Sequence, residues 1–331
     1  MSRAVRALIG LALTGLALFA AALAFGDQPV PFGELIAALT GSPEASPVSV
    51  LIVNGLRLPR AMLAYLVGAA LGAAGLIAQT VMRNPLAEPG LLGINAGAAA
   101  AALILLVRTG GASAHLVPWF AFAGALGMAA AIYALSWRGG ASSIRIILIG
   151  IGLNALAAAL AAFITAFGEV TAVQQAQVWL AGSVFDARWE KVSALALWLA
   201  PALVLAMLAA RELDMLAFGE NIARGLGQRA QLVSGLSIGL CALLAAAAVA
   251  AAGPVAFVGL IAPHAARRLV GRAHVRLLPV AAMTGGAIVL AADLFGRLAI
   301  APAQLPVGLT TTAIGAPFFG WLLWRRRHVH A

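Results

Sequence analysis

The sequence predicts an all-α polytopic membrane protein with about ten transmembrane helices. Hydrophobic residues make up 63% of the 331 residues and charged residues only 10%, which is more apolar surface than a soluble domain of this length can bury. The apolar residues also form charge-free runs that are long enough to cross the hydrocarbon core of a bilayer as helices. We therefore expect residues 1–331 to form a single transmembrane domain.

Ten spans follow from these runs and their flanks. The run at 7–26 is longer than the core of a usual signal peptide, so we interpret it as the first span. The run at 230–266 is too long for one crossing, and Gly253-Pro254 divides it because proline cannot donate a helical hydrogen bond. The predicted spans are 7–26, 61–82, 89–107, 109–137, 146–168, 192–210, 230–251, 255–271, 277–298 and 298–324. Their many Ala and Gly residues would let helix backbones approach closely in lipid.

The distribution of basic residues predicts the orientation of the chain. Ten crossings place both termini on the same side of the membrane. If that side is the cytoplasm, 15 of the 21 Lys and Arg residues lie in inner segments, as the positive-inside rule requires. We therefore expect cytoplasmic N- and C-termini. The net charge of +10 reflects this topology rather than a surface for nucleic acid.

Two polar stretches between spans are predicted to contain short helices. The inner stretch 211–229 has apolar residues near helical spacing that Gly219 interrupts, which is typical of two short helices on the membrane face. The outer stretch 169–191 carries three glutamines followed by Trp179, which indicates an interfacial helix. For 211–229 the alternative is an ordinary connecting loop. For 169–191 the alternative is the same helix with no contact to a ligand.

The second span has unusual residues at both ends. Arg57 and Arg60 stand at its outer start, beside the stretch 27–50, which contains no basic residue. At its inner end, Asn84-Pro85 predicts a non-helical break because the residue before proline is pushed out of the helical region. Arginines at one mouth and a broken turn at the other suggest a channel, with a partner docking above and a gate below.

The sequence contains no motif for catalysis or for a cofactor. There is no GxxxxGK[ST] phosphate loop, no HExxH or GxSxG motif and no Cys/His cluster. The acid deep in a span is Asp293, and Arg297 lies four residues later on the same helix face, so we expect the two to pair. Such a pair gives little support to an ion-coupled secondary transporter, and a membrane enzyme would need paired acids or histidines. We expect no cofactor and no metal in this chain.

Six segments of the chain, in order, resemble the permease family of ABC importers for ferric siderophores, haem and cobalamin. The resemblance extends from about residue 50 to 324. The segments are RLPR (57–60), RNPLAEPGLLGINAG (83–97), WLAGS (179–183), LAFGENIARGLG (216–227), AGPVAFVGLIAPHAARRLVG (252–271) and ADLFGRLAIAPAQLPVGLTTTAIGAPFFGWLL (292–323).

The resemblance implies a type II ABC importer permease fold in the bacterial inner membrane. Two permease chains, copies or paralogues, would form a dimer around the translocation path. Two ATPase subunits below would bind ATP and Mg²⁺, and a periplasmic substrate-binding protein would dock above, so this chain would not be an enzyme. The GINAG and WLAGS segments look more like siderophore permeases, which favours an iron chelate, a ferric siderophore above all. A haem or cobalamin permease is the alternative within the family, and an ion-coupled secondary transporter is the alternative from another class.

The resemblance also implies roles for particular residues. Arginines at a wet outer rim would pair with glutamates of the binding protein, and these are Arg57, Arg60 and Arg297. The cytoplasmic gate would be lined by Asn84, Leu86, Ser142 and Ser143. The stretch 211–229 would form the coupling helices that contact the ATPase, with Leu216, Gly219, Glu220, Ala223, Arg224, Gly225 and Gly227 as the matching residues.

Overall fold

The computed structural model describes residues 3–26, 28, 30–43, 45–137 and 143–327, and its regular elements are helices. In chain order they are α1 (Arg3–Ala24), α2 (Phe32–Thr40), α3 (Pro47–Val50), the π-helix η1 (Leu51–Arg57), α4 (Leu58–Val81), the 3-10 helix η2 (Pro89–Leu92), α5 (Ile94–Arg108), the 3-10 helix η3 (Ala114–Leu116), α6 (Val117–Ser136), α7 (Ser143–Phe167), α8 (Val170–Leu180), α9 (Trp189–Leu208), α10 (Ala210–Ala217), α11 (Glu220–Gly225), α12 (Ala230–Ala252), α13 (Val258–Val270), α14 (His274–Leu298) and α15 (Val307–Arg327).

Seven helical stretches of the described residues are long and apolar enough to cross a membrane. They are Arg3–Ala24, Pro47–Val81, Ala114–Ser136, Ser143–Phe167, Trp189–Leu208, Ala230–Ala252 and His274–Leu298. Ile94–Arg108 and Val307–Leu322 are shorter apolar helices. Together with α13, these helices account for every predicted span, so the prediction of an all-α polytopic membrane protein is confirmed.

Three predicted spans are shorter than the apolar runs that suggested them. The run from residue 89 becomes α-helical only at Ile94, because Pro89–Leu92 forms a 3-10 turn and Gly93 adopts a left-handed φ of 72°. The run from residue 109 becomes α-helical at Val117. The segment 255–271 contributes only 13 helical residues, since Phe257 before it and Gly271 after it both have positive φ angles.

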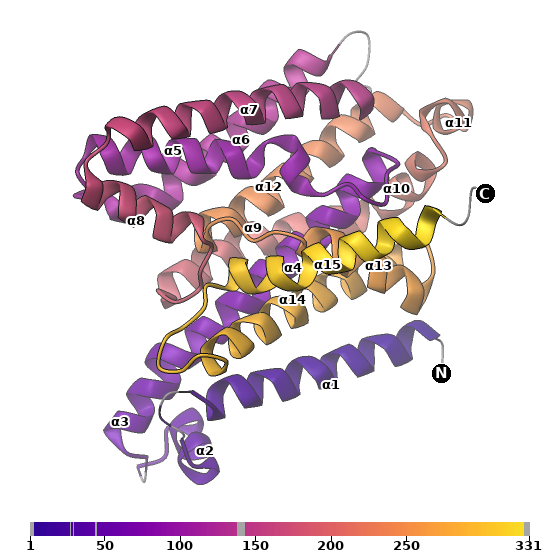
Figure 1. Cartoon of the computed structure of the whole chain (residues 1–331). Coiled ribbons are helices and arrows are strands. Elements are labelled where there is room, and N and C mark those ends of the chain that lie inside the picture. The colour runs from indigo at the N-terminus through magenta and orange to yellow at the C-terminus, as the bar shows by residue number, and fades with distance from the viewer. Residues whose placement is uncertain (1–2, 27, 29, 44, 138–142, 328–331) are drawn as a thin grey trace.

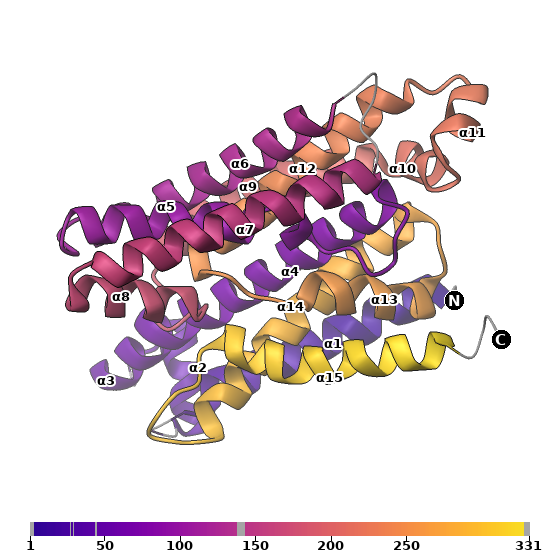
Figure 2. The same cartoon turned by 45° about the horizontal axis from the view of Figure 1, so that its top comes forward.

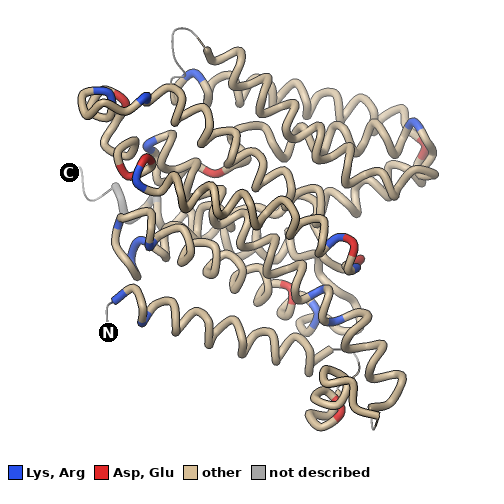
Figure 3. Tube along the Cα trace, turned by 180° about the vertical axis from the view of Figure 1, so that it is seen from behind, with Lys and Arg blue, Asp and Glu red and all other residues tan. Residues whose placement is uncertain are grey.

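The helices pack side by side, and α1 begins at the same face of the bundle at which α15 ends (Figures 1 and 2). We call this the termini face and the other end of the bundle the opposite face. The short helices α10 and α11 lie at the termini face, whereas α2 and α3 lie at the opposite face. Charged residues gather toward these two faces, and the length of helix between them is almost free of charge (Figure 3). This pattern fits a bilayer that surrounds the middle of the bundle.

Helix α4 forms the centre of the bundle. Twenty of its 24 residues are buried, and it packs against α12, α13 and α14. Its glycines permit this packing: a Cβ on Gly68 would lie 2.1 Å from the carbonyl oxygen of Gly285 in α14, and one on Gly75 only 2.0 Å from that of Gly259 in α13. The small residues thus bring helix backbones into contact, as predicted for helices in lipid.

Both polar stretches between spans contain the short helices predicted for them. The stretch 169–191 holds α8, and the stretch 211–229 holds α10 and α11. Gly219 separates α10 from α11 with a φ of 111°, a conformation that side chains other than hydrogen rarely permit.

Candidate functional site

A buried ion-pair cluster joins α4 and α14 at the opposite face. The Asp293 side chain is 2% exposed, and its Oδ1 lies 2.8 Å from Nη2 of Arg60. Nε of Arg60 also donates to both carboxylate oxygens at 3.1 Å, and its Nη1 donates to Oε1 of Gln304 at 2.7 Å. The guanidinium fork of Arg60 is therefore held by partners from two other segments of the same chain.

Arg297 is the second base of this cluster. Its Nε lies 3.4 Å from Oδ2 of Asp293, one helical turn earlier, so the predicted pairing is confirmed. Its Nη2 donates to the carbonyl oxygen of Ala22 near the end of α1 at 3.2 Å. Sequence reasoning missed that Arg60 is the nearer partner of Asp293, because the two residues are 233 positions apart and share no local pattern.

Arg57 binds backbone carbonyl groups at the C-terminal end of α1. Its Nη1 donates to the carbonyl oxygens of Leu23 at 2.7 Å and Ala24 at 3.0 Å, and its Nη2 donates to the carbonyl oxygen of Gln28. The last carbonyl groups of a helix lack partners within the helix, and a basic side chain satisfies them favourably. Arg57 therefore ties the start of the second span to the end of the first.

The expectation that these arginines form a wet rim is wrong. The residues Arg57, Arg60 and Arg297 are only 7%, 9% and 5% exposed, because α1 and Asp293 supply partners from within the chain. A carboxylate of a binding protein would have to displace these partners. Their role in docking stays a prediction. Two bases nearby, the exposed Arg188 and the half-buried Lys191, have nitrogens 3.1 and 3.3 Å from carboxylate oxygens of Asp186.

A hydrogen-bonded turn follows α4 at the termini face. The side chain of Asn84 accepts a hydrogen bond from the backbone N–H of Leu86 at 2.9 Å, which forms an Asx turn through Pro85. The predicted break in the helix is thus confirmed. The hydroxyl of Ser143, at the start of α7, donates to the carbonyl oxygen of Val81 at 3.4 Å and so lies beside this turn. Ser142 lies outside the described residues, and the gating role of all four predicted residues stays a prediction.

Glu88 connects this turn to the start of α13. The backbone N–H of Phe257, the residue that precedes α13, favours the charged form of the Glu88 carboxylate. Burial raises the pKa of Glu88, and the hydrogen bond from Phe257 opposes that rise with a smaller effect. Glu88 and Phe257 belong to two of the segments quoted above, but no spacing in the sequence indicated that they meet.

The stretch containing α10 and α11 presents an apolar surface at the termini face. Phe218, Ile222 and Leu226 follow one another at intervals of four residues and are 71%, 55% and 64% exposed. Leu216 and Ala223 are buried beneath them, and Arg224 pairs with Glu220 at 3.1 Å along α11. The helices are thus anchored on one side and carry an uncovered apolar stripe on the other.

Glycines in this stretch differ in their conformational role. Gly219 and Gly227 have φ angles of 111° and 84°, which favour glycine. Gly225 is the last residue of α11, and a Cβ there would meet nothing within 4 Å in this chain, so its role in coupling stays a prediction.

Residues 13–325 match the model of the FecCD transport family. The chain belongs to the FecCD transport family. This family consists of ABC permeases, which have no catalytic activity of their own, so the prediction that the chain is not an enzyme is confirmed. Among the residues that the structure describes, no group of three His, Cys, Asp or Glu side chains could hold a metal ion.

Named relatives of this FecCD permease match nearly its whole length. The achromobactin transport system permease protein CbrC of Dickeya dadantii is 43% identical over 95% of this chain and 89% of the relative. The iron(3+)-hydroxamate import system permease protein FhuG of Bacillus subtilis is 40% identical over 83% of this chain and 84% of the relative. A solved structure of an inward-facing conformation of a protein assigned as a metal-chelate type ABC transporter is 28% identical, with a TM-score of 0.86 over 96% of this chain and 98% of that one.

Proposed function

We propose that this FecCD permease moves an iron chelate, a ferric siderophore above all, across the bacterial inner membrane. The observation that carries the proposal is its 40% identity over most of the chain to a permease named for iron(3+)-hydroxamate import. The likeness in fold to a metal-chelate type ABC transporter supports the same class of substrate. Movement would be driven by ATP hydrolysis in partner subunits, which would bind the ATP and Mg²⁺.

The termini face is, in this proposal, the cytoplasmic face. The positive-inside rule supports this orientation, because the segments that the sequence assigns to the inner side hold 15 of the 21 Lys and Arg residues. Labelling of single cysteines with an impermeant maleimide in intact cells tests this orientation. A cysteine replacing Ala114, at the opposite face, should react from outside, whereas one replacing Gly227 should react only after the membrane is opened.

The apolar stripe of Phe218, Ile222 and Leu226 is the surface that we propose for the ATPase. Three exposed apolar side chains of this size on one short stretch favour an interface with another protein. Replacing Ile222 and Leu226 together by serine should abolish co-purification of the ATPase. Leu232 is also exposed, at 55%, but belongs to α12, so Leu232→Ser serves as the control that should retain the ATPase.

We place the periplasmic binding protein at the opposite face and a second permease, copy or paralogue, beside this one. Arg57, Arg60 and Arg297 gather at that face, and this supports it as the docking surface even though their present partners are internal. The gate would lie at the turn of Asn84 and Leu86 with Ser143, where two segments of the chain meet. Cysteines at Leu86 or Ser143 should crosslink to their symmetry mates to an extent that changes with nucleotide state.

Uptake into proteoliposomes tests the substrate and the energy source together. The permease, its ATPase and its binding protein should accumulate a ferric siderophore when ATP is enclosed, and a protonophore should not reduce that uptake. Accumulation of haem or a corrinoid instead would support the alternative within the family. Uptake that requires a proton gradient and ignores ATP would support a secondary transporter.

A further inference from the structure

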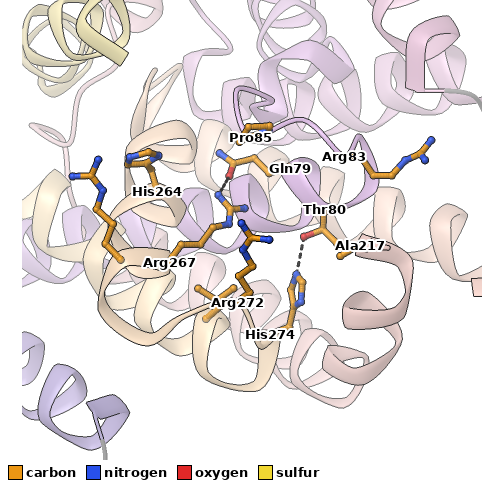
Figure 4. Close-up of a pocket in the computed structure, with 11 residues that line it drawn as sticks. Gln79, Thr80, Arg83, Pro85, Ala217, His264, Arg267, Arg272 and His274 are labelled. Atoms are coloured by element: carbon orange, nitrogen blue, oxygen red, sulfur yellow. Dashed lines mark hydrogen bonds between the residues drawn. The ribbon is translucent and has the colours of Figure 1, made fainter. Parts of the chain in front are cut away.

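A cationic pocket of about 520 Å³ opens at the termini face between α4, α10, α13 and α14 (Figure 4). The residues that line this pocket include none of the residues proposed for the gate, for docking or for coupling. Its lining residues are Gln79, Thr80, Arg83, Pro85, Ala217, His264, Arg267, Arg268, Arg272, His274 and Leu277. Four of them are arginines and two are histidines, and none of these described lining residues is acidic.

The arginines come from three different segments of the chain. Arg267 and Arg268 stand in the last turn of α13, where the helix dipole favours basic side chains. The dipole does not explain Arg272, which follows the end of α13, or Arg83, which lies in the turn after α4. Arg83, Arg268 and Arg272 are exposed at this face. A concave site with charges of one sign from separate segments attracts anions.

Hydrogen bonds hold the polar wall of the pocket in place. Nη1 of Arg267 donates to Oε1 of Gln79 at 2.5 Å. The hydroxyl of Thr80 and Nε2 of His274 are 2.7 Å apart, and Nδ1 of His274 lies 2.6 Å from Oδ1 of Asp214. Figure 4 shows the Arg267 and Arg272 side chains both directed toward Gln79. Two cationic groups directed to one neutral amide concentrate positive charge, which favours an anion at that place.

We propose that this pocket binds a phosphate group, carried either by the headgroup of an anionic phospholipid or by a soluble phosphate compound. Arginine forks match phosphate oxygens in pairs. The volume exceeds that of a bare anion and accommodates a phosphate with attached groups. Basic pockets between membrane helices at the cytoplasmic side suit lipid headgroups, and this one lies at the ends of α4, α13 and α14. The proposal rests on the topology proposed above and is independent of the transported substrate.

A bound phosphate would lie beside the two segments that we propose to move during transport, the gate turn and the stretch that contacts the ATPase. The pocket is walled by Pro85 of the gate turn and by Ala217 at the end of α10. A Cβ on Gly219 would lie 3.1 Å from Nη1 of Arg83, so Arg83 reaches from the turn to the junction of α10 and α11. A phosphate bound by Arg267 and Arg272 would therefore lie between Pro85 of the gate turn and Ala217 of the stretch proposed for ATPase contact.

Phosphate binding by the purified full-length chain tests the proposal without any transport assay. One arm uses native mass spectrometry to count anionic phospholipids that remain bound after delipidation and addition of phosphatidylglycerol or phosphatidylcholine. The other arm follows the thermal unfolding midpoint in detergent as inorganic phosphate replaces chloride at constant ionic strength. Retained phosphatidylglycerol assigns the site to lipid, and stabilisation by phosphate alone assigns it to a soluble compound.

The charge-reversal variant Arg272→Glu should weaken the phosphate or lipid binding by about tenfold or more, since it replaces an attractive contact by a repulsive one. Arg276→Glu is the matched control, because Arg276 is also an exposed arginine near the start of α14 but does not line the pocket. If Arg272→Glu fails to fold, Arg268→Gln replaces it. Equal binding in both variants and the wild type would overturn the proposal. So would loss of ATPase co-purification in Arg272→Glu with phosphate and lipid binding unchanged, which would assign the pocket to an acidic group of the ATPase.

Discussion

Arg60 and Asp293 form a buried ion pair that closes one end of the bundle, with Nη2 of the arginine 2.8 Å from Oδ1 of the aspartate. Arg297 approaches the same carboxylate at 3.4 Å. One acid therefore compensates two guanidinium groups at the ends of α4 and α14, and both the stability of this face and its availability to a partner depend on Asp293.

Replacing Asp293 by alanine should destabilise the permease. Breaking a buried pair leaves an uncompensated charge, which costs about 3–5 kcal/mol in the free energy of unfolding. Asp186→Ala removes the partner of the exposed Arg188. This substitution should change the free energy of unfolding by less than about 1 kcal/mol. Denaturant unfolding of the purified chain in detergent measures both. Equal, small effects of the two substitutions would show that the buried pair adds little.

Substitutions at Asp293 and at Arg60 should change the affinity for the binding protein in opposite directions. If Arg60 and Arg297 receive carboxylates of that protein, Asp293→Asn removes their internal competitor and should tighten binding, whereas Arg60→Gln should weaken it. The dissociation constant, measured on permease in nanodiscs at two salt concentrations, decides between these effects. Weakening by both substitutions would mean that the pair only holds the fold and that the docking surface lies elsewhere.

Substitutions at Gly219 and Gly225 should have unequal effects. Gly219→Ala places a side chain at a φ of 111° and should cost about 1–3 kcal/mol locally, with loss of coupling between ATP hydrolysis and transport. Gly225→Ala meets nothing within 4 Å in a helix and should preserve coupling. The ratio of transported substrate to hydrolysed ATP in proteoliposomes measures coupling. An uncoupled Gly225→Ala would refute this distinction.

The packing of α4 should tolerate no side chain at Gly75. A Cβ there would overlap the backbone of Gly259 at 2.0 Å, so Gly75→Ala must push α4 and α13 apart. Overpacking of this kind costs about 1–3 kcal/mol or more and should lower the thermal unfolding midpoint. Gly239→Ala in α12 is the matched control, since a Cβ there meets nothing within 4 Å. A normal midpoint for Gly75→Ala would contradict the close contact of the two helices.

The pH dependence of stability should carry a contribution from Glu88. Burial raises its pKa in the folded state above the ordinary value of 4.5. A raised acid pKa means that the folded state holds a proton more tightly, so this contribution is present below pH 4.5 and is lost as pH rises through the folded pKa. Glu88→Gln keeps an acceptor for the N–H of Phe257 and should flatten that decline. Glu190→Gln, at an exposed site, should leave the loss of stability with rising pH unchanged. Thermal unfolding measured at a series of pH values from below 4.5 upward tests both variants.

The sequence by itself determined the local features of this permease. Charge-free runs of sufficient length predicted the spans, the pair Asn84-Pro85 predicted the turn after α4, and Gly219 predicted the division of α10 from α11. Each of these depends on residues that are neighbours along the chain, where hydrophobic length, proline and glycine act directly on the backbone. The ends of α5 and α13 were less predictable, because the positive φ angles of Gly93 and Phe257 shorten apolar runs that composition alone would continue.

Only the tertiary structure decided what the charged residues contact. The family resemblance implied an exposed rim formed by Arg57, Arg60 and Arg297. In the structure, contacts with Asp293 and with the end of α1 bury these side chains. The contact of Glu88 with Phe257 and the cationic pocket arose in the same way, from segments more than a hundred residues apart. Long-range contacts leave no periodic trace in a sequence, because any complementary partner at the right place in the bundle can satisfy a buried charge.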